Sequence, residues 1–203
     1  SANSGFIQAF GSEGEQKNAS KSGATTFGYD AETSGLAIGF DGMTQTGETI
    51  GLSASFSTTD VDGKGTGQSK NSIDSYTVSV YADKATENGY IEGSLTYGIN
   101  DNTSSRILDV DGTSRTYSSS YDSEQVSLKV GGGAPKEVQD GTFVTPFISA
   151  TGTVISTDDY TETSTIASDA LRLRIAQDDI SSVVGTVGVK AHMITDKGTP
   201  MIS

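Results

Sequence analysis

Alternation between apolar and polar side chains is the feature of this sequence that most limits how the chain can fold. Ile91, Leu95 and Ile99 are separated by even numbers of positions, and Glu92 and Thr96 occupy positions between them. A period of two residues places successive side chains on opposite faces of a β-strand, whereas a helix requires a period near 3.6. This stretch therefore predicts a strand with one apolar face and one polar face.

The same alternation recurs along the chain, with polar, glycine-rich breaks between the alternating stretches. The facing of the seventh stretch is ambiguous because Pro146 interrupts it. Residues 170–175 form either a short strand or the first half of the eighth stretch, and a ninth begins at Thr199. We predict an all-β, antiparallel up-and-down fold with strand-like segments at residues 5–11, 34–41, 49–58, 75–82, 90–108, 124–131, 142–155 and 182–193.

Two all-β architectures fit this pattern, a soluble sandwich and a transmembrane β-barrel with a wet lumen. Only 33% of the residues are hydrophobic and 7% are aromatic, which makes a thick dry core hard to fill. Gly, Ser, Ala and Thr dominate the polar face, and short connections alternate with long ones, as in membrane barrels. Adhesin repeats rich in Ser and Thr also have small polar faces. The residues favour the barrel and leave the sandwich open.

Composition and charge exclude several classes of function. The chain has no Cys, so it has no disulfide framework and no thiolate metal site. A net charge of −13 disfavours nucleic acid, whose phosphates attract Lys and Arg. No apolar stretch approaches the roughly 20 residues of a membrane helix. No signal peptide opens the sequence, so we expect a processed chain or a piece of a longer one.

The strongest metal-binding candidate is a repeated Asp-Val-Asp-Gly motif at residues 60–63 and 109–112. Calcium loops begin with alternate Asp residues before a Gly, but both copies lack the later bidentate Glu. Asp-Gly is itself a turn signal. We therefore predict a turn at each copy and no metal site.

No group of residues predicts an enzyme. His192 is the single histidine, and no Ser lies in a nucleophile-elbow motif. Residues 63–67 are glycine-rich but lack the Lys-Ser/Thr ending of a phosphate-binding loop. We predict no catalytic residues and no cofactor.

Short motifs spread over nearly the whole chain resemble, in order, the β-barrel translocator domain of autotransporters, the type V secretion proteins. They lie at residues 28–30, 35–41, 74–76, 80–82, 90–98 with Arg106 beyond, 145–147 and 184–189. The family barrel has twelve strands and an aromatic carboxy-terminal strand, whereas this chain has about eight and ends in Met-Ile-Ser. Phe6 stands where the family often has Trp. We expect residues 1–203 to be a single β-barrel domain, either a fragment that lacks the carboxy-terminal strands or a shortened relative that closes differently.

The resemblance implies a place in the outer membrane of a Gram-negative bacterium. It also implies a translocator that anchors there and carries or displays an N-terminal passenger, with outer-membrane lipid, the passenger and the barrel-assembly machinery as partners. The alternative is a soluble β-sandwich or adhesin-type surface module with a binding or structural role.

In a membrane barrel, the alternation assigns a direction to each strand residue. Charges opposite the apolar face line the lumen, where water solvates them. These lumen-facing charges are Glu92, Lys129 and Lys190. The expected lipid-facing residues are Leu36, Ile38, Phe40, Ile50, Leu52, Phe56, Val78, Val80, Ile91, Leu95, Ile99, Val126, Leu128 and Val130.

Overall fold

The computed structural model describes residues 3–21, 24–166, 169–193 and 201–202, and this part of the chain is all-β. None of these residues forms a helix long and apolar enough to cross a membrane. Seven short strands lie near the connections: β2 (Ala19–Lys21), β3 (Ala24–Thr26), β9 (Lys136–Gln139), β11 (Tyr160–Thr161), β12 (Thr163–Ser164), β13 (Arg174–Ile175) and β15 (Met201–Ile202). The long strands are β1 (Asn3–Gln16), β4 (Tyr29–Met43), β5 (Glu48–Gly63), β6 (Lys70–Thr86), β7 (Gly89–Val110), β8 (Thr113–Gly133), β10 (Thr142–Thr157) and β14 (Ile180–Met193).

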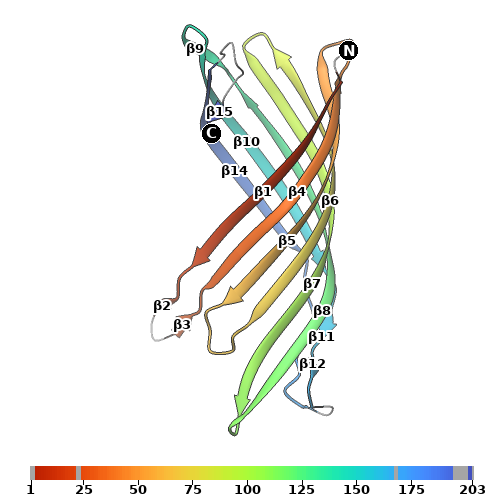
Figure 1. Cartoon of the computed structure of the whole chain (residues 1–203), viewed down its shortest axis with the longest axis vertical. Coiled ribbons are helices and arrows are strands. Elements are labelled where there is room, and N and C mark those ends of the chain that lie inside the picture. The colour runs from red at the N-terminus through yellow and green to blue at the C-terminus, as the bar shows by residue number, and fades with distance from the viewer. Residues whose placement is uncertain (1–2, 22–23, 167–168, 194–200, 203) are drawn as a thin grey trace.

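Every long strand pairs antiparallel with the next long strand along the chain. The resulting sheet twists and curls into a half-barrel, with mostly short turns at one rim and, apart from the tight β7–β8 turn, longer connections at the other (Figure 1). This confirms the predicted up-and-down architecture. Among the described residues β1 pairs only with β4, and β14 pairs only with β10 and β15, so the sheet is open between β1 and β14.

The strands extend further than the alternating pattern indicated. The first Asp-Val-Asp-Gly copy was predicted to be a turn, and this is wrong: residues 60–63 are the end of β5. Asp60 accepts a hydrogen bond from Ser72 (2.7 Å), and Asp62 pairs with Lys70 (3.2 Å), so β6 extends alongside. The second copy does contain the predicted turn between β7 and β8.

That turn depends on two residues with positive φ. Asp111 has φ of 51° and Gly112 has φ of 75°. Two adjacent positive φ values give the type I′ twist that matches the right-handed twist of the flanking strands. The tight turn lets β7 and β8 continue as a paired hairpin well past the ends of their neighbours (Figure 1).

The carboxy-terminal part of the chain answers two open questions. Residues 170–175 are not part of the eighth strand, because Arg174–Ile175 is the separate short strand β13, which pairs with β11. The predicted ninth-strand start at Thr199 lies outside the described residues, and Met201–Ile202 pairs with β14.

The two faces of the sheet differ in chemistry and in exposure. Cross-strand register aligns Phe40, Leu52, Val80, Leu95 and Leu128 in one row. All five are exposed, with Phe40 70% and Leu52 64% accessible. We call this apolar face the outer face and the opposite face the inner face. Inner-face side chains are more sheltered, as expected for the concave side of a curled sheet.

The described part of the chain has no packed hydrophobic core of the kind that a water-soluble domain has. There, Tyr117 is the only buried hydrophobic side chain, whereas the apolar outer-face residues are largely exposed. Exposed apolar surface on this scale marks a site of contact with another apolar phase, because each Å² removed from water gains roughly 25 cal/mol. The described strands form no second sheet that packs on this face.

Candidate functional site

Paired hydroxyl groups run across the inner face of the sheet. Each pair joins two hydroxyl side chains, Ser or Thr, on neighbouring strands, so the hydroxyls satisfy one another while the surface stays polar. The pairs are Thr33–Thr59 (2.9 Å), Ser55–Thr77 (2.6 Å), Ser79–Thr96 (2.7 Å) and Ser127–Thr153 (2.8 Å). The alternation that exposes apolar groups on one face therefore builds a hydrated surface on the other.

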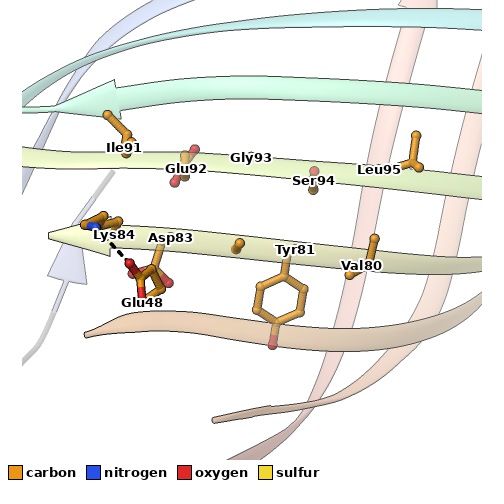
Figure 2. Close-up of a pocket in the computed structure, with 11 residues that line it drawn as sticks. Glu48, Val80, Tyr81, Asp83, Lys84, Ile91, Glu92, Gly93, Ser94 and Leu95 are labelled. Atoms are coloured by element: carbon orange, nitrogen blue, oxygen red, sulfur yellow. Dashed lines mark hydrogen bonds and ion pairs between the residues drawn. The ribbon is translucent and has the colours of Figure 1, made fainter. Parts of the chain in front are cut away.

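Glycines on the inner face make room for the aromatic rings of neighbouring strands. A Cβ added to Gly51 would lie 2.1 Å from the Tyr81 ring, so a larger residue there must displace the ring. The Tyr81 hydroxyl donates a hydrogen bond to Asp41 (3.0 Å), which fixes the ring across β5. Figure 2 shows Val80 and Leu95 directed to one side of the sheet and Tyr81 to the other.

The structure places the predicted lumen charges on the inner face and brings two of them together. Lys129 Nζ lies 2.9 Å from Glu92 Oε1, and both side chains are partly exposed. Lys190 lies elsewhere, with its Nζ 4.9 Å from the centre of the Phe147 ring. Glu92 and Lys129 therefore compensate each other's charge, whereas Lys190 contacts the face of an aromatic ring.

An open depression of about 500 Å³ lies between β5, β6 and β7 near the short turns (Figure 2). At its edge Lys84 Nζ pairs with Glu48 Oε1 (2.7 Å). The Thr44 and Thr46 hydroxyls also donate hydrogen bonds to the Glu48 carboxylate. These contacts fasten the β4–β5 turn. Much of the remaining lining is hydrocarbon, and it assembles no nucleophile with a base.

A polar cluster with two buried carboxylates lies at the opposite rim, where the β10–β14 connection contacts the β7–β8 hairpin. The Arg106 guanidinium binds the Glu162 carboxylate through two hydrogen bonds of 2.7 Å each. The same guanidinium stacks 4.4 Å from the centre of the Tyr117 ring. The hydrogen bonds from Arg106 favour the charged form of Glu162, so the pKa of that carboxyl is lowered, although burial alone would raise it.

A second buried carboxylate completes this cluster. The Asp169 side chain accepts hydrogen bonds from the Leu171 N–H (3.0 Å) and the Tyr117 hydroxyl (2.7 Å). Arg115 Nη1 lies 3.3 Å from the same carboxylate. These donors, led by the Leu171 N–H, lower the pKa of Asp169 to about 2.

Sequence reasoning identified only one member of this cluster. Arg106 was singled out by resemblance, whereas Tyr117, Glu162 and Asp169 were missed. Glu162 is 56 positions from Arg106, in a segment without alternation, so no local signal connects them. No group of three or more His, Cys, Asp or Glu that could hold a metal ion was found in the described part of the chain.

Comparison with known families decides between the two architectures. The model of the autotransporter beta-domain matches residues 5–202. The chain belongs to this family. Comparison with curated protein sequences gave no match.

Two solved autotransporter domains share the fold. The translocator domain of autotransporter NalP from Neisseria meningitidis is 18% identical, with a TM-score of 0.76, over 94% of this chain and 62% of that one. The beta domain of the Bordetella autotransporter BrkA is 21% identical, with a TM-score of 0.73, over 99% of this chain and 76% of that one. The chain thus spans less than two thirds of the NalP domain.

The family explains the two-faced sheet. An autotransporter beta-domain lies in the outer membrane of a Gram-negative bacterium, where β-strands cross the bilayer. The exposed apolar outer face suits a membrane environment, and the soluble sandwich is not favoured. Autotransporter translocator domains are transport structures rather than enzymes.

Proposed function

We propose that this domain anchors in the outer membrane and gives an N-terminal passenger a hydrated route across it. The separation of the two faces carries this proposal. Exposed aliphatic rows cover the outer face, and paired hydroxyls cover the inner face. An extended polypeptide has unpaired backbone N–H and C=O groups, which need water or polar partners during passage. The inner face supplies both.

The residues of the outer face are proposed to contact lipid. Leu95 and its row neighbours Val80 and Leu128 are 47–56% exposed, so nothing in the described chain covers them. Acyl chains remove this surface from water without a protein partner. Glu92, Lys129 and Lys190 are proposed to face the lumen, where water and the nearby partners described above stabilise their charge.

The edge of β1, and the part of the β14 edge that β15 does not cover, require partners in the membrane. Each edge presents backbone groups that lipid cannot satisfy. We propose that residues 1–203 are part of a single barrel domain in which additional strands pair with these edges. We propose the barrel-assembly machinery as the partner that closes it, and outer-membrane lipid and the passenger as the remaining partners. We propose no catalytic role, because the buried carboxylates found are fully occupied by donors from the chain.

Residues 1–203 contain no Cys, so cysteine labelling tests the assignment of the faces directly once any Cys elsewhere in the full-length protein is replaced by Ser. Leu95→Cys and Thr96→Cys are adjacent positions on opposite faces, so each serves as the control for the other. In the natural full-length protein in lipid vesicles, a fluorophore at position 95 should be quenched by lipid-soluble quenchers. A fluorophore at position 96 should be quenched by water-soluble ones. Equal access of both probes to water would refute the membrane assignment.

A further inference from the structure

The connection between β10 and β14 is folded against the neighbouring hairpin. We call its described residues, 158–166 and 169–179, the lobe. The Asp158 N–H donates to the Asp122 carbonyl (3.0 Å), and β12 pairs with β8 through Thr163–Ser118 and Ser164–Tyr117. Within the lobe β11 pairs with β13. Figure 1 shows β11 and β12 beside the far end of β8, beyond the rim that carries the long connections.

The lobe contacts the inner face of the hairpin. Continuous register from Thr96 places Arg106 on the inner face, and its cross-strand partner Tyr117 shares that face. Tyr121, four positions from Tyr117, lies on the same side and stacks on Tyr160 of the lobe, with ring centres 4.1 Å apart. The lobe therefore lies on the side of the hairpin toward which the lumen opens.

Burial of its two anchoring carboxylates distinguishes this contact from an incidental surface pairing. Glu162 is 6% exposed and Asp169 is 5% exposed. A buried carboxylate is stable only when charged or polar donors surround it. Glu162 accepts from Arg106 and from the Leu173 N–H (2.8 Å), so donors reach both of its oxygens.

Asp169 is surrounded in the same way. Its Oδ1 accepts from the Leu171 N–H, and its Oδ2 accepts from the Tyr117 hydroxyl and from the Ser164 hydroxyl (3.2 Å). Tyr117 is 0% exposed, so it serves as the buried centre between the two carboxylates. We call Arg106, Arg115, Tyr117, Glu162 and Asp169 the latch.

We propose that the latch holds the lobe against the lumen side of the β7–β8 hairpin, so that the lobe narrows the outer mouth of the translocation route. This inference rests on the proposed function, because it requires a hydrated lumen. In the latched state the exit lies between the lobe and the opposite wall of the barrel. Opening requires the lobe to leave its donors, which exposes Tyr117 and separates Arg106 from Glu162.

Three variants of the natural full-length protein test this proposal. Glu162→Gln keeps the side-chain shape but removes the charge that holds Arg106. Ser118→Cys with Thr163→Cys joins two positions that pair across β8 and β12, so a disulfide locks the lobe. Glu13→Gln is the control, because it removes one acidic charge from the exposed part of β1.

Two measurements are made on each variant. Trypsin cleavage after Arg172 and Arg174 in detergent reports release of the lobe. Glu162→Gln should raise the cleavage rate at least about tenfold, since hydrogen bonds to charged groups are lost. Conductance in planar bilayers reports the width of the mouth. It should rise in Glu162→Gln, remain at the wild-type value in the oxidised cysteine pair, and be unchanged in Glu13→Gln.

The outcomes separate the possible failures. If trypsin cleaves Glu162→Gln no faster than wild type, the latch does not hold the lobe. If cleavage rises while conductance stays constant, the lobe is only a brace beside the passage, and the narrowing is refuted. If every variant inserts but none conducts, the hydrated lumen of the proposed function is refuted, and the narrowing with it. Docking of the lobe is still decided by the trypsin rates in that case.

Discussion

Replacement of Leu95 by Arg should cost roughly 2–4 kcal/mol of unfolding free energy in a lipid bilayer, the range for a charge near the midplane of a barrel. The depth of Leu95 follows from the strand. The apolar outer-face positions of β7 run from Ile91 to Ile99, with Leu95 at the centre. Eight steps of about 3.3 Å at a tilt of about 40° span about 20 Å, close to the height of a barrel's apolar band.

Two further variants test whether the cost of Leu95→Arg comes from contact with lipid or from lost packing. Ile91→Arg lies at the end of the same band, so its cost should fall to about 0–1 kcal/mol. Thr96→Arg places its side chain on the inner face. It should lower the free energy of unfolding by about 0.5–1.5 kcal/mol, because the hydrogen bond between Thr96 and Ser79 is lost. The lumen solvates the introduced charge.

Reversible urea unfolding in vesicles, followed by fluorescence of a reporter group, measures the three costs. The expected order is Leu95→Arg well above both Ile91→Arg and Thr96→Arg. Equal costs at Leu95 and Ile91, which are 48% and 56% exposed, would show that depth in a bilayer is not what decides them. The lipid-facing assignment would then be refuted.

Two more predictions concern the inner face and the latch. Gly51→Ala should destabilise the barrel by about 1–3 kcal/mol in the same unfolding assay, because the added Cβ collides with the Tyr81 ring. Gly152→Ala is the control and should be nearly neutral, because no atom lies within 4 Å of its added Cβ. Docking of the lobe lowers the pKa of Glu162 and of Asp169, so both carboxylates stabilise the docked lobe at pH values above their usual pKa. This stabilisation is lost as the pH falls through the lowered pKa values, which for Asp169 is about 2. The Leu171 and Leu173 amides should therefore be protected from hydrogen exchange near neutral pH, and should lose protection relative to the intrinsic exchange rate only below about pH 4. Loss of protection already between pH 8 and 5 would contradict the assigned hydrogen-bond partners.

The sequence by itself determined the two faces of the sheet and the order of its strands. A period of two is a local property: each strand residue alternates direction whatever its neighbours are. Short breaks such as residues 44–47 and 87–88 make the strands that they join pair antiparallel, so much of the up-and-down order followed as well. The alternating pattern did not determine the lengths of the strands. The polar ends of β5 and β6 extend the sheet past the alternating segments because each strand satisfies the other's backbone groups.

Tertiary structure alone decided the facing of β10 and the existence of the latch. Pairing with β14 places Ile148 on the outer face, at 68% exposure, and Phe147 on the inner face against Gly188 and Lys190. The latch joins Arg106 to Glu162 across a connection with no period of its own. An isolated arginine and an isolated carboxylate carry no sign of each other in the sequence, because their attraction acts only once the fold has brought them together and excluded water.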